Sequence, residues 1–331
     1  MDLSDLKLRL HRFRNRKLAT ILTYHSVVDL PLPFGMWNHL PLGQFADQMA
    51  LLAQEAQVIS LQEMARGIAA GTLPQYAVAV TFDDGFRNNF TRAYPVLQKY
   101  RIPATIFLST GYIDGTELFW PERLAYQLMR TPRQSLPTSL FGHLELQTAA
   151  ERRAAFGTIR TALKTLHPRE LQKNIADLEE CLGVERREED PLVQEWLPLT
   201  WQDVRAMEAD GLVSFGGHTV SHAILSHLGE AEALQEISGC RTALDHHLGH
   251  RTTCWAHPNG TRQDFGRGHL EMLAAHTFTT VLTAEPGYVS CRSDLAMLPR
   301  MGVHNRMDSR GLMRVLAKPT RPDSGTGECP R

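Results

Sequence analysis

Short apolar runs alternate along the chain with longer stretches in which apolar residues recur at helical spacing. The runs predict strands over residues 20–24, 57–60, 77–82, 104–108, 212–215, 253–256 and 279–283, with a further short strand near residues 297–303. The intervening stretches predict helices over residues 44–53, 62–70, 88–99, 201–210, 230–248, 266–276 and 308–317. Such alternation is typical of a mainly parallel sheet covered by helices.

Seven or eight such strands fit a (β/α) barrel over residues 18–317 better than an open nucleotide-binding sheet. The sequence has neither GxGxxG after the first strand nor GxxxxGK(S/T), so it lacks the common phosphate-binding loops. Asn88 or Asn89 is placed to cap the helix over residues 88–99, and Gly211 to end the helix over residues 201–210.

One region, residues 121–198, interrupts the alternation because it contains almost no strand pattern. Between Glu151 and Asp190, 17 of 40 residues are charged, and leucines recur there near helical spacing. We expect a helical insertion on one strand-to-helix loop, where insertions are tolerated and often line the active site. The alternative is a solvated bundle with no role in substrate binding. Residues 318–331, rich in proline and glycine, predict a disordered tail.

The first 17 residues are basic and precede the apolar residues 18–24. That order is typical of a signal peptide, but the apolar stretch is short, contains two threonines and lacks a small-residue cleavage site. We therefore expect a basic helix followed by a buried strand, and a cytoplasmic protein. Apolar residues at helical spacing within residues 2–17 fit either packing on the barrel or a peripheral contact with a membrane surface.

Composition excludes several classes of protein. The 331 residues are 43% hydrophobic, which supports a full core, and no apolar run approaches the length of about 18 residues that a membrane helix needs. Lys and Arg number 35 against 36 Asp and Glu, a net charge of -1. A nucleic-acid partner is therefore not expected, because such proteins usually carry a basic excess.

Two adjacent carboxylates, Asp83 and Asp84, follow the predicted strand over residues 77–82. The carboxyl ends of parallel strands carry the chemistry of α/β barrels. Because neighbouring side chains point in different directions, one carboxylate can bind a cation while the other remains free as a base. A polar turn that caps the next helix is the alternative.

Two histidines, His218 and His222, follow another apolar run and two glycines. Histidines four residues apart lie on one face of a helical turn and can share one metal ion. A pair of histidines with one carboxylate is a recurrent hydrolytic metal site. A third segment, Trp255-Ala-His-Pro-Asn-Gly260, predicts a tight turn whose backbone N–H groups can face an oxyanion.

Together these segments resemble the polysaccharide deacetylases, the NodB-homology group of carbohydrate esterase family 4. The matching motifs are Thr81-Phe-Asp-Asp-Gly85, His218-x-x-x-His222, Tyr24-His25-Ser-Val27, Pro103-Ala-Thr-Ile-Phe-Leu108, Pro258-Asn-Gly260 and Leu298-Pro-Arg300. They cover residues 18–120 and 199–305. The resemblance implies a distorted (β/α) barrel with one divalent metal ion, most often Zn²⁺.

The resemblance also implies roles for individual residues. In that family the first aspartate is the general base and the second binds the metal with both histidines, which assigns Asp83 as base and Asp84, His218 and His222 as ligands. The turn after the histidines supplies a backbone N–H to the oxyanion, here that of Asn259. A histidine acts as general acid on the departing amine.

The chain departs from the family pattern at several positions. The usual turn begins with arginine and has an aromatic residue before its glycine, whereas this chain has Ala256 and Asn259. Tyr24-His25 is typical of a permuted branch whose acid histidine lies near the start of the chain, so we favour His25 as the acid over His304. Arg300 either orients Asp83 or forms a structural salt bridge.

The leading hypothesis is a metal-dependent hydrolase that removes N-acetyl groups from a sugar, oligosaccharide or polysaccharide. Asp83 would take a proton from the attacking water, the Asn259 N–H would bind the oxyanion, and His25 would protonate the amine. An O-acetyl esterase and a catalytically decayed carbohydrate-binding barrel are the alternatives. A glycosidase is disfavoured, because adjacent aspartates do not easily flank a bond at the required separation of roughly 5 Å.

Overall fold

A parallel, curled sheet forms the centre of the protein. The computed structural model describes residues 3–30, 36–138 and 141–317. Within this part of the chain the sheet has eight strands in the order β11-β10-β9-β6-β5-β1-β12, with β4 also paired to β5. The strands are β1 (Thr20–Tyr24), β4 (Gln57–Val58), β5 (Ala77–Phe82), β6 (Ala104–Leu108), β9 (Val213–Gly217), β10 (Cys254–Ala256), β11 (Thr280–Leu282) and β12 (Met301–Gly302).

The two ends of the strand order are joined by one segment. Leu298 forms a parallel bridge with Leu282 of β11, and four residues later Gly302 pairs with Thr23 of β1. The segment therefore completes a distorted (β/α) barrel, as the sequence predicts.

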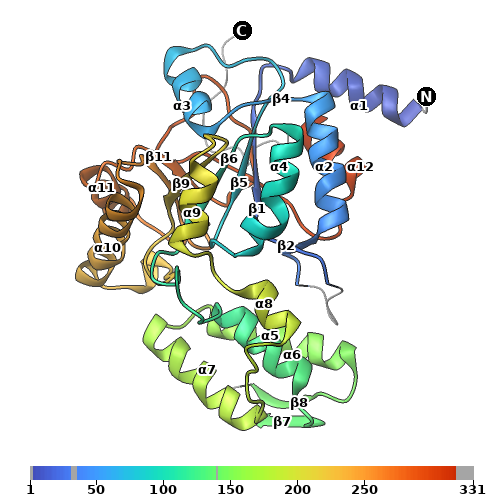
Figure 1. Ribbon diagram of the computed structural model, residues 1–331, viewed down its shortest axis with the longest axis vertical. Helices are drawn as coiled ribbons and strands as arrows, with labels where there is room; N and C mark the ends of the chain where they lie inside the picture. Colours follow the sequence, from blue (N-terminus) through green and yellow to red (C-terminus); the bar gives the residue numbers. More distant parts are fainter. Residues whose placement is uncertain (1–2, 31–35, 139–140, 318–331) are drawn as a thin grey trace.

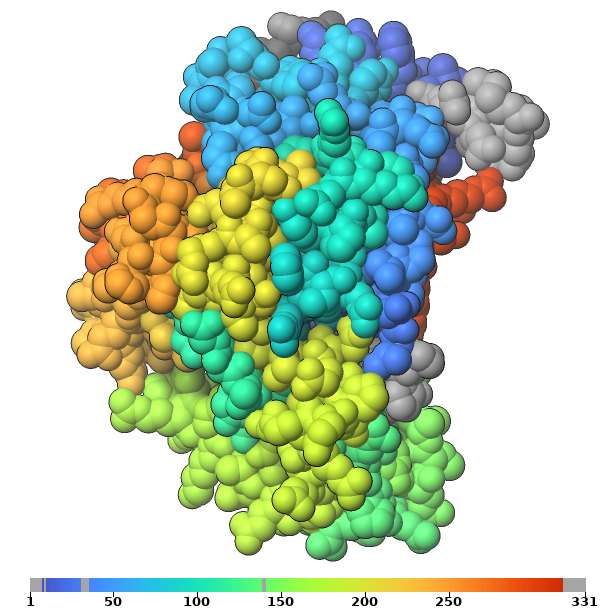
Figure 2. Space-filling view, in the orientation of Figure 1, coloured from blue at the N-terminus to red at the C-terminus, as the bar shows by residue number. Residues whose placement is uncertain are grey.

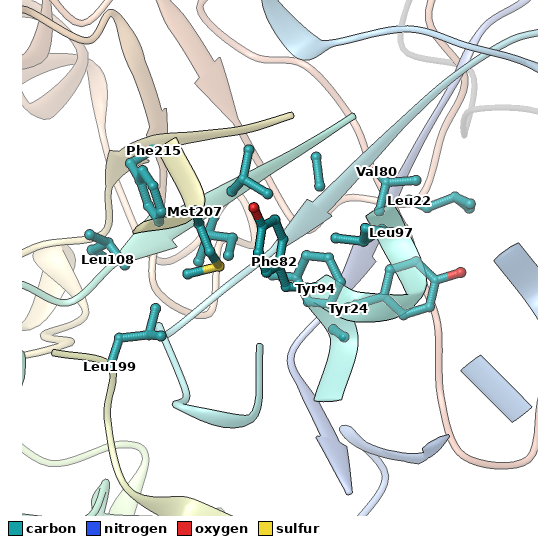
Figure 3. Packing of buried hydrophobic residues seen from close by; sticks show 14 of the residues in the cluster. Leu22, Tyr24, Val80, Phe82, Tyr94, Leu97, Leu108, Leu199, Met207 and Phe215 are labelled. Atoms are coloured by element: carbon teal, nitrogen blue, oxygen red, sulfur yellow. The ribbon is translucent and has the colours of Figure 1, made fainter. Parts of the chain in front are cut away.

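Helices surround this barrel (Figure 1). They are α2 (Leu42–Glu55), α3 (Leu61–Ala70), α4 (Tyr94–Tyr100), α9 (Trp201–Glu208), α10 (Glu230–Leu248), α11 (Arg267–Ala275) and α12 (Ser309–Ala317). All six residues of β5 are buried, because parallel strands are covered on both faces. Figure 3 shows one of these faces, where Phe82 belongs to one hydrophobic cluster with Tyr24 of the adjacent strand β1, Phe215 of β9, Leu97 of α4 and Met207 of α9.

The insertion between β6 and β9 forms a separate lobe, in green below the barrel in Figures 1 and 2. It comprises α5 (Trp120–Arg130), β7 (Ser135–Thr138), β8 (Gly142–Glu145), α6 (Ala149–Leu163), α7 (Pro168–Leu182) and α8 (Pro191–Trp196), and it has its own hydrophobic core. The insertion is mainly helical, as the sequence predicts, and it also contains one short antiparallel pair, β7 and β8, that the sequence pattern did not predict. Both strands are short and largely exposed, so they leave no apolar run in the sequence.

The N-terminal helix α1 (Leu3–Arg14) lies against α12. Arg12 is buried at this contact and donates a hydrogen bond to Glu55 of α2 at 2.9 Å, whereas Leu10 and Phe13 are exposed. No described helix is both long and apolar enough to cross a membrane. Membrane contact and cytoplasmic location stay predictions, and the expected tail over residues 318–331 lies outside the described residues.

Candidate active site

A cavity of about 260 Å³ opens where the barrel strands end. Its lining includes seven of the residues singled out in the sequence, namely His25, Asp83, Asp84, His218, His222, Asn259 and Arg300. These residues follow β1, β5, β9 and β10 or precede β12, because the carboxyl ends of parallel strands meet at one end of a barrel. The insertion supplies the opposite wall, so it is not a bundle remote from the cavity.

Asp84, His218 and His222 form a cluster with the geometry of a metal site. Oδ1 of Asp84 lies 3.5 Å from Nε2 of His218 and 3.1 Å from Nε2 of His222, and the three ligand atoms are within 4.8 Å of one another. Oδ1 of Asp84 is buried and, among the described residues, accepts no well-oriented hydrogen bond. Three ligand atoms that converge without well-oriented hydrogen bonds to one another fit the coordination of a shared cation.

Burial alone would raise the pKa of Asp84, but the charge of His222 holds it well below its usual range. The carboxylate therefore stays ionised, which is the state that binds a cation. His218 is fixed in the matching tautomer, because its Nδ1 lies 2.7 Å from the carbonyl oxygen of Ala256 and must donate its proton there. The Nε2 lone pair is left to face the cluster.

The loop that carries both histidines is held by a residue on α10. Glu236 accepts hydrogen bonds from the N–H groups of Val220 and Ser221 at 2.8 and 2.9 Å and from the Ser221 hydroxyl at 2.7 Å. His222 has a φ of 59°, a conformation that β-carbon-bearing residues rarely adopt and that surrounding contacts must enforce. The Glu236 carboxylate supplies three of those contacts.

The two glycines before His218 have a packing role. A Cβ on Gly216 would lie 2.6 Å from the ring of Phe107, and one on Gly217 would lie 2.6 Å from the ring of Trp255. Only glycine lets β9 pass between these two aromatic side chains, so the strand delivers His218 to the cavity without a shift of its neighbours.

Asp83 and Arg300 form a bidentate ion pair inside the barrel. Nη1 and Nη2 of Arg300 each donate to one carboxylate oxygen of Asp83 at 2.7 Å, and Nε of Arg300 donates to the carbonyl oxygen of Thr283 at 2.9 Å. Burial would raise the pKa of Asp83, but the charge of Arg300 lowers it below its ordinary value. Arg300 thus forms an ion pair with Asp83, and its role in orienting Asp83 for the reaction stays a prediction.

His25 lies at the end of β1 with its ring edge-on to Trp37, the ring centroids 5.3 Å apart. Its Nδ1 is buried and has no hydrogen-bond partner among the described residues. Burial lowers the pKa of His25, although the charges of Asp84 and Asp83 oppose this shift. By contrast His304, the alternative acid, is exposed and does not line the cavity.

Asn88 and Asn89 hold the segment that contains His25. The Asn89 amide donates to the His25 carbonyl oxygen at 2.7 Å, and the Asn88 carbonyl accepts from the Val27 N–H at 3.1 Å. The expectation that one of them caps a helix is wrong. The helix begins instead as a π-helical turn, η1 (Asn89–Ala93), without a side-chain cap, because both amides are engaged by the segment after β1.

Asn259 occupies the turn after β10 with a φ of 61°, which asparagine tolerates better than most residues. Its side chain accepts from Nζ of Lys164 at 2.6 Å and donates to Asp264 at 2.7 Å. Its backbone N–H has no partner among the described residues and is free to bind an oxyanion. His257 in the same turn stacks on Phe265 at 4.0 Å, and burial lowers its pKa to about 3, so it stays neutral.

Three residues around the site were not singled out in the sequence, namely Lys164, Glu236 and Asp264. Each lies on a helix or in a polar loop without a motif of its own. The charged character of the insertion was visible, but nothing in it distinguished Lys164 from its neighbours.

Comparison with known proteins places these residues in a family. The family model described as polysaccharide deacetylase matches residues 70–280. The poly-β-1,6-N-acetyl-D-glucosamine N-deacetylase of Staphylococcus epidermidis is 38% identical over 74 residues, 22% of this chain and 26% of that protein. The Staphylococcus aureus (strain N315) protein of the same name is 38% identical over 77 residues, 23% of this chain and 26% of its own length. The matched region thus spans about a quarter of these relatives.

Solved structures resemble the fold over most of the chain. Streptococcus pyogenes deacetylase PplD, in complex with acetate, superposes with a TM-score of 0.61 and 18% identity, covering 90% of this chain and 98% of that one. IcaB from Ammonifex degensii gives a TM-score of 0.58 and 19% identity, covering 91% and 98%. At this level of identity the likeness establishes the barrel architecture.

Proposed function

The chain belongs to the polysaccharide deacetylase family, and on that premise we propose that it is a metal-dependent hydrolase that removes N-acetyl groups from a glycan. The observation that carries the proposal is the convergence in one cavity of the Asp84–His218–His222 cluster and the Asp83–Arg300 pair. Such a set would supply a cation site beside a fixed carboxylate, and these are the two requirements of water activation.

Asp84, His218 and His222 would hold the ion, for which we propose Zn²⁺ because two histidines and a carboxylate are a common zinc ligand set. When bound, the ion supplies Lewis acidity to the attacking water and to the acetyl carbonyl.

The chain's own residues supply the proton transfers. Asp83, held by Arg300, would accept a proton from the attacking water. The Asn259 N–H would donate a hydrogen bond to the acetyl oxygen as negative charge develops on it. His25 would give a proton to the nitrogen as the C–N bond breaks, leaving acetate and a free amine.

The names of the relatives and the lining of the cavity support the substrate class that we propose. The staphylococcal relatives are named for poly-β-1,6-N-acetyl-D-glucosamine, and we propose an N-acetylated glycan as the substrate here. The cavity is lined by Trp37, Phe119 and Trp120, and flat apolar side chains of this kind suit the faces of sugar rings.

Acetate release tests the proposal. Metal-loaded protein, chelated protein and the Asp83→Asn variant would be compared on N-acetylglucosamine oligosaccharides with β-1,6 and β-1,4 links and on O-acetylated sugars. We expect acetate from the amides with loaded protein only. Acetate from the esters alone would identify an O-acetyl esterase, and oligosaccharide binding without acetate would identify a carbohydrate-binding barrel.

A further inference from the structure

Two cations of the insertion, Arg160 and Lys164, line the cavity from the wall opposite the barrel. Arg160 lies in the last turn of α6 and Lys164 directly follows the helix. At a spacing of four residues the two side chains share one face of the helix. Both residues are partly buried, so neither is an ordinary solvated surface cation.

The acidic residues that line the cavity are already paired. Asp83 binds Arg300, Asp84 faces its two histidines, and Glu122 lies 3.0 Å from Nε2 of His39. Within the described ranges, neither Arg160 nor Lys164 forms an ion pair. Two positive charges are therefore left over in the lining of the cavity.

The hydrogen bonds of these cations do not replace a counter-charge. Nζ of Lys164 donates to a neutral acceptor, Oδ1 of Asn259, at 2.6 Å. Nε of Arg160 is buried without a partner among the described residues, and the guanidinium lies 5.8 Å from the centroid of the Phe156 ring.

Both cations are destabilised where they lie. Burial lowers the pKa of Arg160, and burial together with the charge of Arg160 lowers the pKa of Lys164. Two like charges that share a partly buried wall repel each other. Nearby carboxylates, Glu122 for Arg160 and Asp264 and Asp84 for Lys164, attract the cations without forming an ion pair and offset the lost hydration only in part. An anion placed between them would relieve both costs.

We propose that Arg160 and Lys164 bind an anionic substituent of the substrate, so that the glycan is acidic rather than neutral. A guanidinium beside an ammonium suits a carboxylate or a phosphate, since both anions accept several charge-assisted hydrogen bonds. Lys164 touches the side chain of Asn259, whose N–H is the oxyanion donor of the proposed function. The anion therefore lies on the acetylated sugar or on its neighbour.

This inference rests on the proposed function for its substrate, and the experiment separates the two. Three probes are compared: a neutral N-acetylglucosamine tetrasaccharide, a tetrasaccharide of alternating N-acetylglucosamine and glucuronate, and an N-acetylglucosamine oligosaccharide that carries a phosphate monoester. Acetate release gives kcat and KM for each, and calorimetry on the Asp83→Asn protein gives binding without turnover.

The variants are Arg160→Gln, Lys164→Met and the double substitution. Arg153→Gln is the matched control, because Arg153 is exposed on the same helix and does not line the cavity. We expect wild-type protein to bind at least one anionic probe more tightly than the neutral one. Each cavity variant should raise KM and Kd for that probe by about 10-fold or more. In Arg160→Gln, which removes no hydrogen bond to Asn259, kcat on the neutral probe should stay unchanged. Whether glucuronate or phosphate shows the effect identifies the anion.

Equal KM values of wild-type protein and equal Kd values of the Asp83→Asn protein for all three probes would overturn the proposal. So would an equal loss on neutral and anionic probes in both single variants, since that result indicates a structural role. If no probe releases acetate, the proposed function fails. The Kd for the anionic probes, measured by calorimetry with and without Arg160→Gln in the Asp83→Asn protein, still decides whether the anion site exists. Metal affinity, measured for every variant, confirms that the cluster beyond the insertion is intact.

Discussion

The two walls of the cavity differ in whether their charged side chains are paired. On the barrel wall Asp83 is clamped by both terminal nitrogens of Arg300, and Asp84 faces two histidines. On the insertion wall Arg160 and Lys164 form no ion pair with any described residue. Charged side chains that already form ion pairs are fixed before the substrate binds, whereas unpaired charged side chains can form an ion pair with the substrate. In the proposed function, the barrel wall would carry out the reaction and the insertion wall would select the substrate.

The hydrophobic cores follow the same division. The barrel packs around β1, β5, β6 and β9, while the insertion packs around Trp196, Ile159 and their neighbours in a cluster of its own. One side-chain link between the walls is the hydrogen bond from Lys164 to Asn259. A lobe with a separate core can change its cavity face without disturbing the reactive groups.

The largest expected effect is that of His222→Ala. Removing one of three ligands should abolish metal binding and acetate release on every glycan, because the remaining pair cannot hold the ion. Equilibrium dialysis and acetate assays measure both. His227→Ala is the control, since His227 lines the cavity outside the cluster and should retain the metal. Full metal affinity in His222→Ala would remove this cluster from the proposal.

The next effect is that of His25→Ala, which should keep the metal and lose turnover. General acid catalysis contributes about 10²–10⁴-fold, so kcat should fall by that factor while metal affinity stays at the wild-type value. His304→Ala should do much less, because His304 is exposed outside the cavity. The reverse pattern, with His304→Ala inactive and His25→Ala near wild type, would make the late histidine the acid.

A smaller effect is expected from Glu236→Ala. The substitution removes three hydrogen bonds that order the loop between the metal histidines. Loss of such supporting contacts typically costs about 10–100-fold in metal affinity, which a competition titration with a chelator measures. Glu230→Ala, an exposed change at the start of the same helix, should leave the affinity unchanged. Identical metal affinities for Glu236→Ala and Glu230→Ala would show that the loop keeps its conformation without the contacts of Glu236.

Much of the barrel wall could be predicted from the sequence, for a physical reason. Asp83, Asp84 and His218 each come directly after an apolar run, and the carboxyl ends of parallel strands meet at one end of a barrel. Once the runs are recognised as strands, the convergence of residues more than a hundred positions apart follows from topology. His25 follows by the same rule from the first strand.

The insertion wall could not be predicted in this way. The role of Lys164 depends on how α6 docks against the turn after β10, and helix docking leaves no local pattern in a sequence. Glu236 depends likewise on the approach of α10 to the loop after β9. The asparagines at residues 88 and 89 show the same limit, since their local pattern favoured a cap and a distant backbone segment engaged them instead.

The smallest expected effect tests whether the two cores are separate. Ile159 in the insertion and Ile106 in β6 are both fully buried, with exposures of 0% and 1%, so Ile→Val at either position should cost about 0.5–1.5 kcal/mol. Hydrogen exchange shows where the cost falls. We expect Ile159→Val to speed exchange in α5–α8 alone and Ile106→Val to speed it in the barrel, with metal affinity unchanged by the first substitution. Faster exchange throughout the chain in both variants would mean that barrel and insertion open as one unit. The insertion wall could then not change independently of the barrel.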